Sequence, residues 1–258
     1  RPPRSTPSNS SAASDVYKRQ MHNRHCYIMQ IKAVLLDFGG TLASGGLDWD
    51  PYHETIRNYL ISHGHPLEMR DLKKALRGTL TNLEKYRATG KEKTFEEVYS
   101  DFLVRLGIPH DDTMLEWLHN NFKTHYKTSF YPCIEELLKG LDAKYKVAMV
   151  SNTMSDQPRM LLEEANLDQY FDLLICSRDL AVRKPNPEIF RIVLDRIDAK
   201  PSETVHVGDS VEADMYGARN AGITGIWIKT PNQPPWNGYA IGNICELPAM
   251  LKALEKSS

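Results

Sequence analysis

The fold is decided by residues 31–41, IKAVLLDFGGT, where an apolar run stops at an acidic residue and a pair of glycines. A short apolar run that ends at Gly39 and Gly40 predicts a buried strand entering a tight loop. Ligands of open α/β sheets bind beyond the carboxyl ends of the strands. We therefore expect Asp37, which follows the strand, to lie at the mouth of a ligand-binding crevice.

A second acidic cluster follows another apolar run far downstream. Residues 204–208, TVHVG, lead directly into Asp209, and Asp214 follows in the next few residues. Two acidic clusters at the ends of strands favour a shared Mg²⁺ ion and a phosphate group, because Mg²⁺ is bound by carboxylates together with phosphate oxygens.

The second half of the chain alternates between strand and helix patterns. With the first strand at 31–38, further strands are expected at 146–151, 173–177, 204–208 and 223–228, and a short sixth one near 240–244. Helices are expected at 156–165, 187–197, 212–221 and 247–255. This alternation predicts an α/β protein with a Rossmann-like parallel sheet and right-handed crossovers.

Between the first and second strands the pattern becomes helical. Helices are expected at 51–62, 67–87, 94–106 and 112–126, and this region shows no good strand pattern. Thr94 followed by Glu97 gives the third helix a capping-box pattern. We predict an α-helical cap domain at 47–127 that lies over Asp37, inserted into a core built from 29–46 and 128–258.

Composition and charge argue against several classes of protein. The 258 residues are 41% hydrophobic and 25% charged, which is ordinary for a globular protein. The 32 basic and 33 acidic residues leave a net charge of −1, which gives no electrostatic reason to bind nucleic acid or a membrane surface. No stretch approaches the roughly 18 apolar residues of a membrane span. We expect a cytoplasmic protein with neither kind of partner, and we leave its oligomeric state open.

The four cysteines are spread along the chain at Cys26, Cys133, Cys176 and Cys245, without a CxxC pair. This spacing indicates neither a zinc site nor a redox pair. We expect reduced, structural thiols, as is usual in a cytoplasm.

Residues 1–20 are expected to lie outside the fold. They are rich in Ser, Pro and Arg and lack the apolar core of a signal peptide. Residues 15–20, DVYKRQ, back-translate to a sequence resembling the transposon mosaic end used to build sequencing libraries. We interpret the segment as a translated adapter or a disordered tail, with Met21 or Met29 as the true start.

Four short segments carry residues suited to phosphate chemistry. They are 37–41 (DFGGT), 150–153 (VSNT), 183–190 (RKPNPEIF) and 208–214 (GDSVEAD). In order and placement they resemble the four motifs of the haloacid dehalogenase-like hydrolase superfamily, and the resemblance extends over the chain from residue 31 onward. It implies a Mg²⁺-dependent phosphatase that hydrolyses a small phosphorylated metabolite through an aspartyl-phosphate, with the helical insert as its cap.

The resemblance implies a nucleophile and a metal site. Asp37 would attack phosphorus, which is feasible for a carboxylate when the repulsion between two anions is relieved. Mg²⁺ would relieve it, held by Asp37, the backbone carbonyl of Gly39 and Asp209.

The same resemblance implies residues that hold the phosphate. Lys184 would stabilise charge in the transition state, and Asp214 would orient Lys184 or a metal-bound water. Asp37, Ser151, Lys184 and Asp214 are thus the expected catalytic residues. Phosphate is expected to contact Gly40, Thr41, Ser151, Asn152 and Lys184.

Gly39 departs from the pattern of the family. Most of its phosphatases carry a second Asp at this position, which serves as general acid and then base, and such a group contributes about 10²–10⁴-fold. The leaving group could need no proton, as in an acyl phosphate. An acid from Asp48, Asp50 or Glu54 could replace the missing one, or the protein could bind phosphate with little turnover. The departure counts against a phosphomutase.

Two other hydrolases stay open as alternatives. A metal-independent 2-haloacid dehalogenase also lacks the second acid, but typically carries a bulkier residue at the Gly39 position. A phosphonate hydrolase has Ala there and a Schiff-base lysine in its cap, for which Lys73, Lys74 and Lys85 are candidates. The pair of acids at 209 and 214 favours Mg²⁺ and thus the phosphatase.

Overall fold

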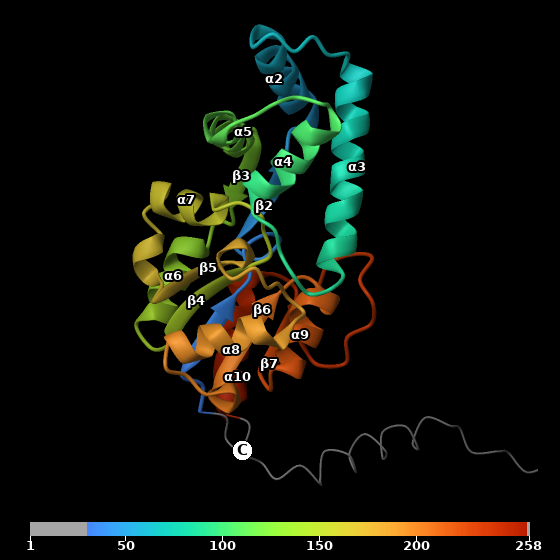
Figure 1. Cartoon of the computed structure of the whole chain (residues 1–258). Coiled ribbons are helices and arrows are strands. Elements are labelled where there is room, and N and C mark those ends of the chain that lie inside the picture. Colours follow the sequence, from blue (N-terminus) through green and yellow to red (C-terminus); the bar gives the residue numbers. More distant parts are fainter. Residues whose placement is uncertain (1–29, 257–258) are drawn as a thin grey trace, which may run out of the picture.

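The computed structural model describes residues 30–256. Its core is a six-stranded parallel sheet with the order β5-β4-β1-β6-β7-β8 (Figure 1). The strands are β1 (Ala33–Leu36), β4 (Lys146–Ser151), β5 (Leu173–Cys176), β6 (Thr204–Gly208), β7 (Thr224–Ile228) and β8 (Tyr239–Ile241). The expected parallel α/β core is confirmed, because each strand forms within three residues of the expected range.

The first strand lies in the middle of the sheet, between β4 and β6. Leu36 is in register with Met149 on one side and Val207 on the other. Because the three strands run in the same direction, their carboxyl ends lie at one edge. The chain segments that follow β1, β4 and β6 therefore meet there, although they are far apart in sequence.

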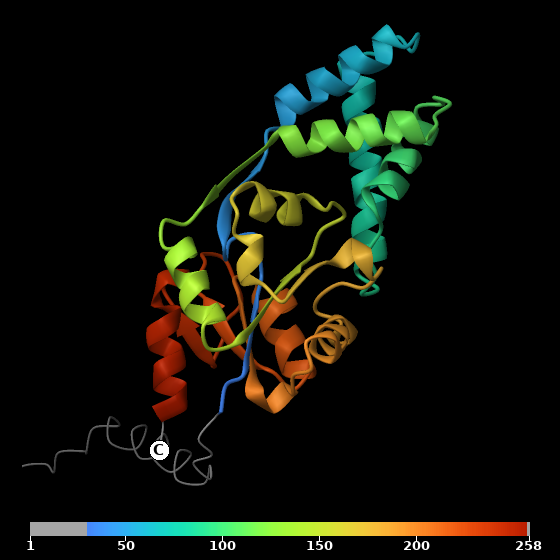
Figure 2. The ribbon, with the colours of Figure 1, turned by 90° about the vertical axis from the view of Figure 1, so that its left-hand side faces the viewer.

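Helices cover both faces of this sheet, so the central strand is buried on both sides. Val34 and Leu36 pack in one apolar cluster with α6 (Ile134–Asp142), α7 (Gln157–Glu164) and α10 (Leu247–Lys256). Ala33 and Leu35 face the other way, toward α8 (Pro187–Arg196) and α9 (Gly217–Asn220). Figure 2 shows the two helical layers on either side of the sheet. This double cover explains why β1 reads as a continuous apolar run.

Part of the expected helix at 212–221 is irregular. A π-helical turn, Val211–Tyr216, precedes the short α9. Short 3₁₀ turns occur at Asp168–Tyr170, Ser177–Asp179, Pro201–Glu203 and Ile244–Glu246.

The insert after the first strand is helical, as expected. It contains α2 (Trp49–Ser62), α3 (Met69–Arg87), α4 (Phe95–Arg105) and α5 (Asp112–Thr124). These helices share an apolar cluster of their own. The capping box of α4 forms, with the Glu97 amide donating to Thr94 Oγ1 at 3.2 Å and the Thr94 amide donating to Glu97 Oε2 at 2.7 Å.

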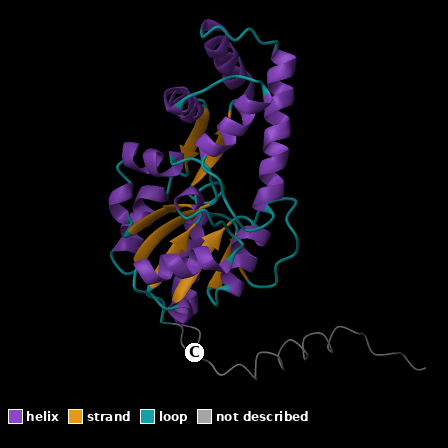
Figure 3. Cartoon of the chain, in the orientation of Figure 1, coloured by secondary structure: helices purple, strands orange, loops and turns teal. Residues whose placement is uncertain are grey.

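A two-stranded ribbon joins the insert to the core, and the sequence reading missed it. β2 (Ala43–Leu47) pairs antiparallel with β3 (Tyr126–Phe130), and Figure 3 shows the ribbon rising from the sheet to the helices. The segments ASGGL and YKTSF contain glycines and polar residues, so neither shows an apolar alternation. The expected division at residues 47 and 127 falls at the ends of this ribbon. That the insert is an independent domain stays a prediction.

The expectation of reduced thiols is wrong for two of the cysteines. Cys133 and Cys245 form a disulfide across 112 residues of sequence, while Cys176 is free and buried. Cys133 precedes α6 and Cys245 precedes α10, and these helices pack on the same face of the sheet. The pairing therefore depends on tertiary structure, and cysteine spacing could not reveal it.

Some expectations fall on residues 1–29, which lie outside the described residues. These are the adapter or tail at 1–20, the starts at Met21 or Met29, and the state of Cys26. Among residues 30–256, no helix combines the length and apolar character needed to cross a bilayer. The cytoplasmic location stays a prediction.

Candidate active site

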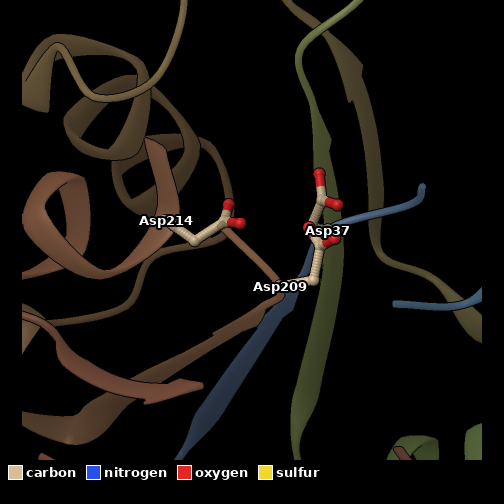
Figure 4. Close-up of side chains that lie close together, drawn as sticks. All are labelled: Asp37, Asp209 and Asp214. Carbon is tan, nitrogen blue, oxygen red and sulfur yellow. The ribbon is translucent and has the colours of Figure 1, made fainter. Parts of the chain in front are cut away.

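Two strand-end acids and a third acid from the following turn come together at the carboxyl edge of the sheet. Asp37 follows β1, Asp209 follows β6, and Asp214 lies in the π-helical turn. Each offers a carboxylate oxygen within 4.8 Å of those of the other two. Figure 4 shows the three side chains close together. The expected convergence of Asp37 and Asp209 is thus present in the structure.

A buried lysine links two of these acids. The ammonium of Lys184 donates to Asp37 Oδ1 at 2.7 Å and to Asp214 Oδ1 at 2.6 Å. Lys184 is only 2% exposed, and a charge buried so deeply is tolerated when it is paired. The structure therefore places a fixed positive charge against Asp37, where the sequence led us to expect it.

Asp214 is held by two further donors. Its Oδ2 accepts from the Ser210 amide at 2.9 Å, and its Oδ1 lies 3.0 Å from His206 Nε2. Burial lowers the pKa of His206, although Asp214 opposes the effect. A neutral imidazole that contacts a carboxylate donates to it, so His206 carries its proton on Nε2.

The sequence reading missed His206. Its only signal was a polar residue inside the apolar strand 204–208, and it is completely buried.

The acids differ in how readily they ionise. Burial raises the pKa of Asp37 to about 7, against the attraction of Lys184, and burial also raises the pKa of Asp209. Burial acts on Asp214 in the same direction, but Lys184 and His206 outweigh it and lower the pKa of Asp214. The negative charge on Asp214 is thus favoured by its partners, whereas burial opposes the charge on Asp37 and Asp209.

The loop after Asp37 depends on a glycine. Gly40 has a φ of +72°, and a Cβ on it would lie 2.3 Å from Asp209 Oδ2. Only glycine permits this close approach. Gly40 and the completely buried Thr41 are not part of the cavity wall that the described residues form, whereas Gly39 is.

Two expected phosphate ligands lie at the end of β4. Ser151 is nearly buried and lines the cavity. Asn152 also lines it, but its amide is bound to the backbone of Lys184: Nδ2 donates to the Lys184 carbonyl and Oδ1 accepts from the Lys184 amide, both at 2.8 Å. The Asn152 side chain therefore positions Lys184.

A cavity of about 710 Å³ opens above these residues, between the core and the insert. Core residues supply its polar floor. The insert supplies Trp49, Leu80, Leu83, Glu84, Arg87 and Phe122, and the ribbon supplies Ala43, Ser44, Gly45, Gly46, Leu47, Tyr126 and Thr128. The described lining does not include the three acids considered as replacements, Asp48, Asp50 and Glu54. It also lacks the three candidate Schiff-base lysines, Lys73, Lys74 and Lys85.

The fold and this site define the class of protein. A family model described as haloacid dehalogenase-like hydrolase matches residues 31–222, so the chain belongs to that family of hydrolases. This finding confirms the resemblance drawn from the four motifs.

The chain is also similar to two named phosphatases and to one solved structure. It is 25% identical to glyceraldehyde 3-phosphate phosphatase from Pyrococcus furiosus, over 89% of this chain and 95% of that protein. It is 28% identical to pyrophosphatase PpaX from Bacillus mycoides, over 78% of this chain and 84% of that protein.

The third is the solved structure of 2-haloacid dehalogenase from Pseudomonas syringae pv. Tomato DC3000. It covers 86% of this chain and 98% of its own, with a TM-score of 0.65 and 23% identity. At this identity the likeness shows the fold alone.

Proposed function

We propose that this protein is a Mg²⁺-dependent phosphatase that hydrolyses a small phosphorylated metabolite through an aspartyl-phosphate on Asp37. The observation that carries the proposal is the buried contact of Lys184 with Asp37, beside the carboxylate of Asp209. Relatives named as phosphatases, aligned over most of their length, support the same reaction.

The acids present fit a divalent cation. Asp37 and Asp209 are two oxygen donors at the edge of a cavity, and burial opposes the charge on both. Carboxylates arranged in this way suit Mg²⁺, which takes few protein ligands and oxygen donors. Asp37, Asp209 and the Gly39 carbonyl would hold the ion, which when bound would relieve the repulsion between carboxylate and phosphate.

We assign the following roles to the residues of the site. Asp37 attacks phosphorus, the bond from phosphorus to the leaving oxygen breaks, and water then hydrolyses the aspartyl-phosphate. Lys184 holds Asp37 in place and stabilises negative charge as it develops. Asp214, with His206 and Asn152 as supports, fixes Lys184, while Ser151 and nearby backbone amides contact the phosphoryl oxygens.

The insert would act as a cap over this reaction. It contacts the loop after β4 directly, with the Phe95 amide donating to the Met154 carbonyl at 2.8 Å. Since core and insert together line the cavity, closing the insert would exclude water and select the substrate.

A 2-haloacid dehalogenase is the second candidate, because Gly39 supplies no acid and the departure of a halide needs none. A dehalogenase would release chloride from 2-haloacids without metal. For a phosphonate hydrolase, borohydride would trap phosphonoacetaldehyde on a lysine. A catalytically weak binder would be stabilised thermally by phosphate without turnover.

The test is phosphate release from acetyl phosphate and phenyl phosphate, with Mg²⁺ and with excess chelator. Activity should require Mg²⁺ and fall by about 10³-fold or more in Asp37→Asn, because the nucleophile is lost. Asp142→Asn, which changes an exposed acid at the end of α6, should match the wild type. Activity that persists in chelator or in Asp37→Asn contradicts the proposal.

A further inference from the structure

We propose that the substrates are aryl phosphates, that is, phosphate esters of phenols whose ring system is bulky and apolar. This inference rests on the phosphatase function proposed above and adds the chemistry of the leaving group. It follows from two independent observations, the proton donors that the cavity offers and the character of its walls.

The acids nearest in sequence to the ribbon are engaged elsewhere. Asp48 is paired with Lys127, and Asp50 accepts from Lys73 at 2.9 Å. Neither acid lines the cavity that the described residues enclose, and the same holds for Glu54. None of the three is therefore placed to act as the general acid that is missing at position 39.

Glu84 is the acid that the insert brings to the cavity. Its Oε1 accepts from Arg87 Nη1 at 3.0 Å, and Arg87 is in turn bound through Nε to the buried Glu92 at 2.9 Å. The Glu84 carboxylate is thus engaged as an acceptor by Arg87.

Where no carboxylic acid of the insert protonates it, a leaving group departs more readily when its anion is stable. An alkyl alcohol leaves as a strong base, whereas a phenol, with a pKa near 10, leaves as a much weaker one. In the first step the Asp37 oxygen bonds to phosphorus and the phosphorus–aryl oxygen bond breaks. The aryloxide takes the electron pair and gains its proton from solvent after departure.

The walls of the cavity match a bulky aromatic group. The apolar side chains that the insert and ribbon contribute to the lining are Leu47, Trp49, Leu80, Leu83, Phe122 and Tyr126, beside the polar Ser44, Thr128, Glu84 and Arg87. Trp49 is 44% exposed, although it is a large aromatic residue. An aromatic ring placed against the apolar part of these walls would bury more apolar surface than a sugar or triose would.

Gly39 adds room on the same side. A Cβ at this position would have no other heavy atom of the described residues within 4 Å. The backbone therefore tolerates a side chain there, and its absence leaves space in a cavity of about 710 Å³, a size that suits ligands much larger than a triose.

The experiment compares matched esters with Mg²⁺ present. Phenyl and cyclohexyl phosphate differ mainly in the acidity of the leaving alcohol, and kcat/KM should favour phenyl by about 100-fold or more. 1-Naphthyl and phenyl phosphate differ mainly in apolar area, and kcat/KM should favour naphthyl by about 10-fold. Glyceraldehyde 3-phosphate should be slower than both aryl esters.

Substitutions test the missing general acid and the apolar walls one at a time. Gly39→Asp should raise turnover of cyclohexyl phosphate more than that of phenyl phosphate, while Gly39→Asn, of the same size but without an acid, should not. Trp49→Ala should reduce the advantage of naphthyl over phenyl to about 2-fold. Val104→Ala, at an exposed apolar residue of α4 outside the cavity lining, serves as the control.

The outcomes distinguish the aryl assignment from the phosphatase function. If the protein hydrolyses acetyl phosphate but turns over cyclohexyl phosphate as fast as phenyl phosphate, the aryl assignment is wrong and the phosphatase function stands. The same holds if 1-naphthyl phosphate is no better a substrate than phenyl phosphate. An equal effect of Gly39→Asp on both esters, or no effect, also overturns it. Failure to release phosphate from acetyl phosphate and every ester overturns the phosphatase itself.

Discussion

Lys184 is the residue on which the geometry of the site depends. Its ammonium group lies between Asp37 and Asp214, and its backbone is bound on both sides by the Asn152 amide. Four motifs that are separate in sequence thus meet at one residue, through its side chain and its backbone. A buried ion pair of this kind is costly to break, because the partner left behind is a charge without compensation.

Replacing this lysine should therefore reduce both activity and stability. In Lys184→Met the two carboxylates would face each other without a cation. We expect phosphatase activity to be lost and the free energy of unfolding to fall by about 3–5 kcal/mol, measured by urea denaturation without Mg²⁺. Lys144→Met, at an exposed position, should change it by less than about 0.5 kcal/mol. Wild-type stability in Lys184→Met would contradict the role of the buried pair.

At the scale of elements, the ribbon of β2 and β3 is the covalent route between core and insert. Its two adjacent glycines differ in what surrounds them. Gly45 has a φ of +139°, and a Cβ there would lie 1.8 Å from the Lys127 carbonyl oxygen. A Cβ on Gly46 would meet no described heavy atom within 4 Å.

This difference gives a matched pair of variants. Gly45→Ala should force the strands apart and destabilise the protein by about 1–3 kcal/mol, because the backbone conformation and the contact both exclude a side chain. Gly46→Ala should be neutral within about 1 kcal/mol. The measurement is the free energy of unfolding, together with kcat. Equal effects of the two substitutions would show that the ribbon does not require the close approach at Gly45.

A histidine lies in a second contact between insert and core. His119 of α5 packs flat against Phe95, with ring centroids 4.4 Å apart. Its Nδ1 lies 2.8 Å from Glu96 Oε1, and its Nε2 lies 2.8 Å from Ser155 Oγ in the loop after β4. Burial lowers the pKa of His119, although Glu96 and Asp156 oppose this effect.

The lowered pKa makes this contact sensitive to acid. Below the unfolded pKa of about 6.5, the unfolded chain binds a proton at His119 more readily than the folded protein does. Stability should therefore fall as the pH decreases from about 7 toward 5. The fall should be smaller in His119→Gln than in the wild type, as measured by urea denaturation at both pH values. His63→Gln, at an exposed histidine of the same insert, serves as the control.

At the scale of the whole molecule, a disulfide ties two distant parts of the core together. Cys133 and Cys245 are 112 residues apart in sequence, and β4, β5, β6 and β7 lie between them. Closing so long a loop restricts the unfolded chain, and the expected stabilisation is about 2–5 kcal/mol.

Reduction should therefore lower the midpoint of thermal unfolding. We expect a decrease of several degrees when dithiothreitol is added to the wild-type protein. The double variant Cys133→Ala/Cys245→Ala should melt at the lower temperature with or without the reductant. If dithiothreitol left the wild-type midpoint unchanged, the bond would not contribute to stability in solution.

Much of this molecule was predictable because the signals are local. Asp37 and Asp209 each follow an apolar strand that glycines help to end, and the strands at 146–151 and 204–208 formed exactly at the expected residues. The capping box at Thr94 and Glu97 also depends on four consecutive residues. Periodicity and turn chemistry are properties of short segments, so they can be read without knowing what packs against them.

What only the tertiary structure decided are pairings between distant residues. The disulfide of Cys133, the contact of His206 with Asp214 and the use of Asn152 to hold Lys184 all depend on which segments the sheet brings together. The position of Asp48 outside the described cavity wall also depends on the tertiary structure. Packing of apolar layers sets these distances, and the chemistry of the site follows from them.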